Sequence, residues 1–197
     1  VVGPRALRGS YSGSSVVKNQ DGIILEIKGM DSAFVHEDDP TLITAEGQMT
    51  LGQVGKFAEE NGLSFPTMPV PKIITVSGAI GTGCHGTGRL SGTLSDLVVG
   101  IKVLDGNGDI RKFTLKDDPE FMLALQVHLG SLGIVLSVTF QCVPAFKLHS
   151  VDSAANMTQT IANIEQIVAA HDYVELFWFP FCKKVWLKVY DRIPDST

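Results

Sequence analysis

Residues 75–88 read Thr75-Val76-Ser77-Gly78-Ala79-Ile80-Gly81-Thr82-Gly83-Cys84-His85-Gly86-Thr87-Gly88. Counted on to Gly92, six glycines crowd around one histidine directly after an apolar run. Backbone without Cβ atoms can bring its N–H groups against a flat or anionic ligand. Ordering each glycine costs on the order of 0.5–1 kcal/mol relative to alanine, and a cofactor packed on the loop would compensate for that cost. We therefore expect a nucleotide cofactor held by main-chain groups, whereas a glycine-rich loop without a ligand is the alternative.

The composition indicates a folded chain with small-molecule partners. Of its 197 residues, 44% are hydrophobic, which is enough to bury a sizeable core. The formal net charge of −5 and the lack of Lys or Arg runs argue against a nucleic-acid or anionic-membrane surface. No apolar stretch approaches the roughly 20 residues of a membrane span, so we expect a soluble protein. The chain begins at Val1 without a methionine, which leaves the compartment open between the cytoplasm and a membrane-associated lumenal site.

The cysteines do not indicate a disulfide framework or a zinc site. Cys84, Cys142 and Cys182 are odd in number and widely spaced, although one disulfide is compatible with them. Cys84 and His85 together lack further ligands at matching spacing. No metal is therefore expected.

The pattern up to residue 145 predicts alternating strands and helices. Thr50 with Gln53 fits a capping box, and Gly62 stands where a C′ glycine belongs. Residues 105–108 read as a hairpin turn, and Asp118 as the N-cap of a helix with proline at its first position. The expected elements are strands 23–27 and 41–45, helix 50–61, strands 97–104 and 110–115, a helix from 118 to about 129, and strand 134–143.

After Pro144 the pattern changes to a second α+β unit that the chain does not complete. The expected elements are strand 146–151, helix 157–170, and strands 173–179 and 185–190. We therefore expect domains at 1–145 and 146–197. Asn156 begins a glycan acceptor pattern, but with Gln159 it also makes a helix N-cap, and we favour the cap.

Gly81-x-Gly83-x-x-Gly86 matches the dinucleotide fingerprint, with Asp105 at the spacing of a ribose-binding acid. A Rossmann glycine loop must open a helix, and the sequence that follows, 87–92, is too glycine-rich to continue one. A nicotinamide-dependent Rossmann enzyme is therefore the weaker alternative. No Gly-Lys-Ser/Thr follows, which excludes a Walker-type phosphate loop.

Several blocks in the same order resemble a known family. Residues 75–86 look like the glycine-rich segment, ending in a His-Gly pair, of flavin-linked oxidoreductases with the vanillyl-alcohol-oxidase (PCMH) type of FAD domain. The sugar-lactone and alditol oxidase branch, which includes gulonolactone oxidase-like enzymes, is the most similar. The likeness continues through residues 94–99, 105–106, 118–121, 129–135 and 143–146. It implies an α+β fold, with an FAD-binding domain of two α+β subdomains followed by the start of an α+β substrate domain.

The resemblance implies an extended FAD, with its pyrophosphate on an N-terminal loop and its isoalloxazine beside the glycine segment. The matching loop is 7–13, whose Gly-Ser turn can form an anion nest, and Arg8 either pairs with phosphate or is solvated. Backbone near the start of strand 134–143 would meet the adenine or ribityl part. The implied cofactor contacts are Arg8, Gly9, Ser10, Tyr11, Ser12, Ser77, Gly78, Gly81, Thr82, Cys84, His85, Gly86, Gly133, Ile134 and Val135.

The N-terminal loop departs from the family pattern. Many relatives carry a histidine there that bonds covalently to the flavin, whereas this chain has Gly9, or Ala6 in an alternative register. We therefore expect FAD to be dissociable. We also expect the strand that leads into this loop to be missing. His85 either fixes the loop by hydrogen bonds or takes part in proton transfer, and the first role is favoured. The small side chain of Cys84 could influence how oxygen reaches the reduced flavin.

The implied reaction is hydride transfer from a hydroxyl-bearing carbon of a polyol or sugar lactone to flavin N5, with oxygen or another acceptor reoxidising the flavin. The family's Glu-x-Arg pair and lysine are expected beyond Thr197, so no catalytic residue is assigned. The chain is thus expected to be a fragment of a longer enzyme. A non-catalytic flavin-binding or structural remnant is the alternative.

Overall fold

The structure is a computed structural model that describes residues 2–5 and 23–193. Its centre is a five-stranded sheet in the order β3-β4-β8-β6-β7, in which every neighbouring pair is antiparallel. The chain combines this antiparallel sheet with helices, which agrees with the predicted α+β class. The sheet strands are β3 (Ala33–Val35), β4 (Leu42–Glu46), β6 (Val98–Leu104), β7 (Ile110–Thr114) and β8 (Ile134–Gln141).

One hydrophobic core joins this sheet to three helices, α1 (Leu51–Glu60), α2 (Val76–Gly81) and α3 (Pro119–Gln126). The side chains of Ile43 and Phe140 are fully buried on neighbouring strands β4 and β8, where they are register partners. Burial of such side chains is the main stabilising contribution to the fold. The core therefore holds the helices, and the glycine segment that contains α2, in fixed positions on the sheet.

Helix α1 begins and ends where the sequence predicts. The Thr50 backbone N–H donates to Gln53 Oε1 at 2.8 Å, and the Gln53 N–H donates back to Thr50 Oγ1 at 3.2 Å. Gly62 follows the helix with a φ of +70°, a conformation that glycine adopts without strain. The predicted capping box and C′ glycine are both confirmed.

The first part of the glycine segment is a helix rather than the open loop that its composition suggested. Thr75 is the N-cap of α2, and its Oγ1 accepts from the Gly78 N–H at 3.3 Å. The C-terminal end of α2 is held by a 3-10 turn, η2 (Leu94–Leu97). Ser95 Oγ of this turn donates to the Ile80 carbonyl at 3.0 Å. The helix ends at Gly81, where a Rossmann loop would begin one, so the geometry agrees with rejecting that fold.

Helix α3 stops at Gln126, three residues short of the predicted end at about Leu129. The backbone leaves the helical region at the C-cap Val127, with φ of −138° and ψ of 61°, and Leu129 and Gly130 then take left-handed angles, with φ of +51° and +75°. Asp118 occupies the N-cap position, as predicted, but its side chain makes no capping hydrogen bond. The chain then turns sharply into β8.

The strand expected to be missing before the N-terminal loop is present. Strand β1 (Val2–Arg5) pairs in parallel with β2 (Ile23–Glu26). The earlier expectation is wrong because residues Val2–Arg5 themselves form this strand. The loop from which Arg8, Gly9, Ser10, Tyr11 and Ser12 were predicted to contact a cofactor lies outside the described residues.

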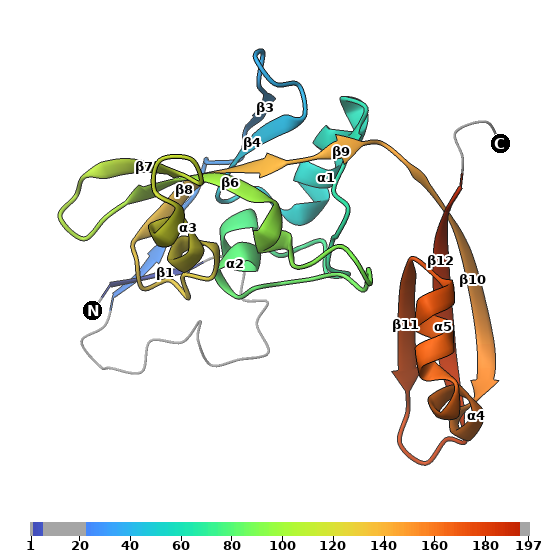
Figure 1. Ribbon diagram of the computed structural model, residues 1–197. Helices are drawn as coiled ribbons and strands as arrows, with labels where there is room; N and C mark the ends of the chain where they lie inside the picture. The colour runs from blue at the N-terminus through green and yellow to red at the C-terminus, as the bar shows by residue number, and fades with distance from the viewer. Residues whose placement is uncertain (1, 6–22, 194–197) are drawn as a thin grey trace.

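The last part of the chain forms a separate three-stranded antiparallel sheet in the order β10-β12-β11 (Figure 1). The helix predicted at 157–170 is divided at Asn163 into two, and Asn156 Oδ1 caps the first by accepting from the Gln159 N–H at 3.1 Å. Strands β5 (Leu63–Ser64) and β9 (Val143–Pro144) pair beside the connection between the two sheets. The elements of the last part are β10 (Lys147–Asn156), α4 (Met157–Ala162), α5 (Ile164–Ala170), β11 (Tyr173–Trp178) and β12 (Lys184–Ile193).

Within residues 2–5 and 23–193, none of the helices combines the length and the hydrophobicity needed to cross a membrane.

Candidate functional site

The first amides of α2 are already hydrogen-bonded within the protein. The Val76 N–H donates to the Met49 carbonyl at 2.8 Å, and the Ser77 N–H donates to the Gly47 carbonyl at 3.0 Å. The next amide, that of Gly78, is taken by the Thr75 side chain. These groups bind α2 to the end of β4, so they do not form the cradle of free N–H donors that the glycine content suggested.

The glycines that follow are needed for close packing inside the protein. A Cβ atom on Gly86 would lie 3.0 Å from both Thr67 Oγ1 and the Met68 carbonyl oxygen, and the Gly86 N–H donates to that hydroxyl. A Cβ on Gly88 would lie 2.8 Å from Cε1 of Tyr173. Contacts within the chain therefore account for these glycines. The expectation that a bound cofactor must compensate for the entropic cost of ordering them is wrong.

Small polar groups after α2 remain exposed. Thr82 is exposed and its Oγ1 donates to the Gly78 carbonyl at 3.0 Å, while Cys84 is half-buried with Sγ 3.5 Å from Thr82 Oγ1. The exposed His85 ring has Nδ1 2.8 Å from the Gly86 carbonyl oxygen. Because a carbonyl only accepts, Nδ1 must carry a proton. This surface therefore offers hydroxyl, thiol and imidazole groups without a charged side chain.

His128, which the sequence analysis did not single out, is packed against the glycine segment. A Cβ on Gly81 would lie 2.8 Å from its Cε1, and the next residue, Leu129, donates its N–H to the Gly81 carbonyl at 2.9 Å. His128 Nδ1 accepts from the Gly130 N–H at 2.9 Å, and Ser131 Oγ donates to the His128 carbonyl at 2.7 Å. The turn at 128–131 therefore fixes the end of α2. A glycine shortly after the end of a helix, here Gly130, is the sequence signal for such a turn.

The His128 imidazole is neutral in this environment. Its side chain is buried, and burial lowers its pKa below the ordinary value, while the Ser77 backbone acts in the opposite direction to a smaller extent. With Nδ1 accepting, the proton is on Nε2, and no described group meets Nε2 with hydrogen-bond geometry even though the Ser77 backbone is close enough to influence the pKa. Nε2 is fully enclosed, so its role is in packing rather than in contact with a ligand.

Two predicted site segments meet at Gly47. The Gly47 carbonyl accepts from the Ser77 N–H, and its own N–H donates to the Leu136 carbonyl at 2.8 Å. A Cβ on Gly47 would overlap the Val135 carbonyl oxygen. Gly133, with φ of +119°, packs its backbone on the Leu104 carbonyl, and Ile134 opens β8. The structure thus brings Ser77 close to Val135, as expected if both belong to one site.

This arrangement fits one part of a flavin better than another. Residues 75–88 contain no Lys or Arg, and the exposed groups at Gly78, Thr82 and His85 form a surface with few side-chain atoms. Such a surface can hold an uncharged planar ring edged by hydrogen-bonding atoms. It offers no cationic side chain that could pair with a pyrophosphate. A phosphate-binding role can fall only to other residues, and the predicted ones lie outside the described part of the chain.

A cavity of about 590 Å³ lies against α1, and none of the predicted site residues lines it. It is therefore distinct from the surface built by the glycine segment.

Two family models match this chain in succession. The model of the FAD binding domain matches residues 2–114, and the model of D-arabinono-1,4-lactone oxidase matches residues 138–197. The first match covers more than half of the chain and includes the whole glycine segment.

Curated relatives are similar over most of the chain. L-gulonolactone oxidase of Scyliorhinus torazame is 29% identical over 172 residues, which are 87% of this chain and 39% of the relative. L-gulono-1,4-lactone dehydrogenase of Mycobacterium tuberculosis is 30% identical over 176 residues, 89% of this chain and 40% of the relative. D-arabinono-1,4-lactone oxidase of Candida glabrata is 25% identical over 83% of this chain and 32% of the relative. The chain therefore spans about two fifths or less of the length of these relatives.

Solved structures show the same fold at lower identity. A cholesterol oxidase variant from Brevibacterium sterolicum superposes with a TM-score of 0.89 at 20% identity, over 100% of this chain and 41% of that one. A solvent-stable cholesterol oxidase gives a TM-score of 0.87 at 23% identity, over 98% of this chain and 41% of that one. At these identities the likeness establishes the architecture alone.

Proposed function

The chain belongs to the FAD binding domain family, and from this premise we propose that it is the flavin-binding part of an oxidoreductase that oxidises a CH–OH group of a sugar lactone, an alditol or a related alcohol. The observation that carries the proposal is the succession of an FAD binding domain and a lactone oxidase segment along one chain. The lactone oxidases and dehydrogenase among the relatives support the same substrate class.

The proposed cofactor contacts are divided between two surfaces. The exposed groups at Gly78, Thr82 and His85 and the half-buried thiol of Cys84, with backbone at Ser77, Gly81 and Gly86, hold and orient the ring system. Backbone at Gly133, Ile134 and Val135 contacts the remainder of the molecule. The pyrophosphate contacts are assigned to Arg8, Gly9, Ser10, Tyr11 and Ser12, on the basis of sequence alone.

Bound FAD would supply a hydride acceptor at its N5 atom, and the residues of this chain would orient it and exclude water. The turn at 128–131 and the contact between Ser77 and Gly47 make the backbone of α2 rigid, so the exposed groups after it keep fixed positions. Rigid supporting contacts are what a cofactor site needs to hold its ligand in one geometry. A small-molecule substrate and an electron acceptor, oxygen or another, complete the proposed reaction.

We propose that FAD is bound without a covalent link. The sequence has Gly9, or Ala6 in the alternative register, where a histidine would be needed to bond the flavin. Precipitation of the loaded protein with trichloroacetic acid should leave the yellow colour in the supernatant. Colour that stays in the pellet would contradict this part of the proposal.

The main test is a titration of the purified chain with FAD, followed by anaerobic addition of L-gulonolactone or an alditol. Saturable quenching of flavin fluorescence, with one FAD per chain, is expected. Bleaching of the flavin absorption bands by the substrate would support an active unit. FAD binding without bleaching would leave a flavin-binding unit that needs further residues for catalysis. Failure to bind FAD would overturn the proposal, and binding of NADH in its place would favour the nicotinamide alternative.

A further inference from the structure

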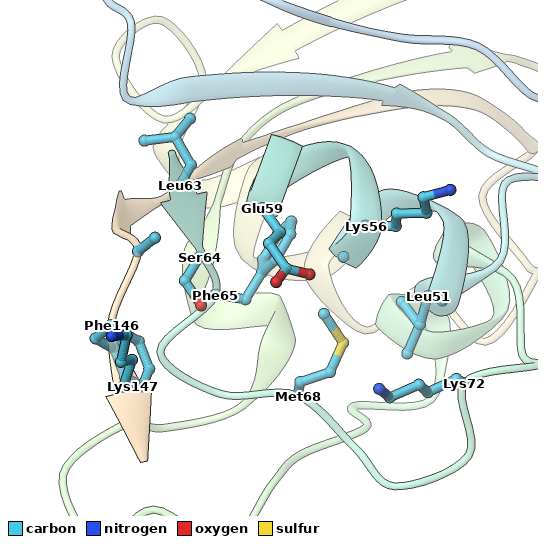
Figure 2. A pocket seen from close by; sticks show the side chains of 13 residues that line it. Leu51, Lys56, Glu59, Leu63, Ser64, Phe65, Met68, Lys72, Phe146 and Lys147 are labelled. Atoms are coloured by element: carbon cyan, nitrogen blue, oxygen red, sulfur yellow. The ribbon is translucent and has the colours of Figure 1, made fainter. Parts of the chain in front are cut away.

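The cavity against α1 lies where the two sheets are connected (Figure 2). Its volume is about 590 Å³, within the range of roughly 300–1,000 Å³ that is typical of small-molecule pockets. One wall is α1, the second is β5 with the chain that follows it, and the third is 145–147 at the start of β10. A ligand in this cavity would therefore touch both the five-stranded part and the three-stranded part of the protein.

The cavity has an apolar lining that is held in place. Leu51 and Phe65 are buried side chains of the core, and Met68 is half-buried beside them. Phe146 forms the opposite wall, and the Arg192 guanidinium carbon lies 4.0 Å above the centroid of its ring. These contacts provide a rigid apolar surface of the kind that binds a flat ligand body.

Gly55 is a helix glycine that packing within the protein does not explain. Glycine in a helix interior costs about 1 kcal/mol relative to alanine. By contrast, Gly52 of the same helix is closely packed, because a Cβ there would lie 3.3 Å from both the Cβ and the carbonyl oxygen of Lys72. At Gly55 the nearest atom to a Cβ would be Met68 Cε at 3.8 Å, an ordinary contact. What Gly55 does is keep the surface of α1 bare on the side of the cavity.

Positive charge predominates at the cavity rim. Lys56, Lys72 and Lys147 line it together with one carboxylate, Glu59. Lys56 pairs with Glu60 at 3.6 Å, whereas Lys72 and Lys147 form no salt bridge with any residue in the described ranges. Figure 2 shows the Lys72 side chain extending toward Met68 and the Glu59 carboxylate directed toward the same space. An anionic group is favoured near the two unpaired lysines, and Glu59 can accept from a hydroxyl of the same ligand.

We propose that this cavity binds a small amphipathic anion, a carboxylate or sulfonate carried on a flat apolar body. The apolar body lies on Met68, Phe146 and the bare helix surface at Gly55, and the anionic group faces Lys72 and Lys147. Because the cavity is lined by α1 and β5 on one side and by the start of β10 on the other, the ligand holds β10 in place against α1. The site is separate from the glycine segment and does not depend on FAD.

Anilinonaphthalene sulfonate, an anionic probe with a flat apolar body, tests the proposal by fluorescence titration of the whole chain. One probe per chain is expected, with FAD present or absent. Gly55→Met fills the cavity floor with a good helix former and should weaken binding at least about tenfold. Glu60→Met places the same side chain on the same helix but outside the cavity, and it should not weaken binding. Circular dichroism and the thermal midpoint of each variant check that the fold is retained.

A second pair of measurements separates charge from apolar contact. The double variant Lys72→Gln, Lys147→Gln changes only exposed side chains and should weaken binding of the sulfonate probe about fivefold. Binding of uncharged phenylnaphthylamine should not change. Three results would overturn the proposal. The first is that Gly55→Met and the unmodified chain bind the sulfonate equally. The second is that lysine removal changes the binding of both probes equally, and the third is that FAD displaces the probe.

Discussion

A Cβ atom placed on Gly81 would lie 2.8 Å from Cε1 of His128, closer than side chains pack in proteins. Gly81 is the last residue of α2, and His128 begins the turn that leads from α3 into β8. The two elements can approach this closely only because position 81 has no side chain. This contact, rather than a ligand, explains the first glycine of the fingerprint.

Replacing Gly81 by alanine is expected to destabilise the protein by about 1–3 kcal/mol, because the added methyl group forces the buried imidazole to move. Gly106→Ala is the matched control, since a Cβ there meets nothing within 4 Å and its φ is not left-handed. That variant should stay within about 0.5 kcal/mol of the unmodified chain. Urea unfolding followed by circular dichroism measures both, and equal stabilities for the two variants would contradict the packing argument.

His128 is expected to make the folded state sensitive to mildly acidic pH. Burial lowers its pKa in the folded state, so the unfolded chain binds the proton more readily below the ordinary value of 6.5. Stability should therefore fall as the pH decreases through 6.5 toward the lowered pKa. Urea midpoints measured between about pH 5 and 8 should show this slope. His128→Gln should remove the slope, and an unchanged slope in that variant would assign it to other groups.

The carboxylates contribute in a different pH range, which keeps the two effects distinct. A hydrogen bond from His171 lowers the pKa of Asp191, and hydrogen bonds from Thr41 lower the pKa of Asp39. Their contributions are present above the ordinary value of 3.8 and are lost as the pH falls through the lowered values. Between about pH 5 and 8 they should not change the slope.

His85→Ala is expected to weaken FAD binding by up to about tenfold without changing stability, since one hydrogen-bonding group is removed from an exposed position. Fluorescence quenching measures the affinity, and thermal unfolding measures the stability. His149→Ala is the control, because it removes an exposed imidazole from β10 in the other sheet. Equal affinities for both variants would remove His85 from the proposed site.

The three cysteines should differ in their reactivity with iodoacetamide. Cys182 is exposed and should react fastest, whereas Cys142 is buried and burial raises the pKa of its thiol to about 12. Cys84 is half-buried next to the proposed ring site, so bound FAD should slow its modification. Peptide mass spectrometry follows each site, with Cys182 as the internal control. Unchanged modification of Cys84 in the presence of saturating FAD would contradict its assignment as a cofactor contact.

Tyr173→Phe is expected to cost about 1–2 kcal/mol, since the tyrosine hydroxyl connects β11 to the segment that follows β5. It donates to the Pro66 carbonyl at 2.9 Å and accepts from Arg192 Nη2 at 3.1 Å. The control is Tyr190→Phe, because Tyr190 is the register partner of Tyr173 on β12. This variant should cost less, because the Tyr190 hydroxyl interacts with the side chain of Lys188 on the same strand. Chemical unfolding compares the two variants, and equal costs would show that the hydroxyl of Tyr173 adds nothing specific.

Most of the fold could be predicted from local sequence. The capping box at Thr50, the glycine after α1 and the hairpin β6–β7 depend on residues close to one another in the chain, so sequence spacing was sufficient. The predicted ends of two helices were wrong, because the backbone conformation there is not visible in the local sequence pattern. The non-helical backbone from Val127 onward ends α3 early, and the division of the last helix at Asn163 was not visible in its apolar pattern.

The candidate site was predicted only in part. The order of blocks along the chain was enough to predict the FAD binding domain family, and the matching family model confirms it. Which glycine-segment groups are available to a ligand could not be read from the sequence, because the Ser77 and Gly86 amides are taken by Gly47 and Thr67. His128 was missed because its significance depends on contact with a helix from another part of the chain.

The sequence by itself determined the local elements, the family, the negative net charge and the expectation of small-molecule partners. These depend on residue type and short-range spacing. Tertiary structure alone decided what the glycines are for. A missing Cβ can open space for a ligand or for another part of the protein, and only the positions of distant residues such as His128 and Tyr173 distinguish the two. At Gly81 and Gly88 that space is filled by the chain itself, whereas at Gly55 it is left open to a cavity.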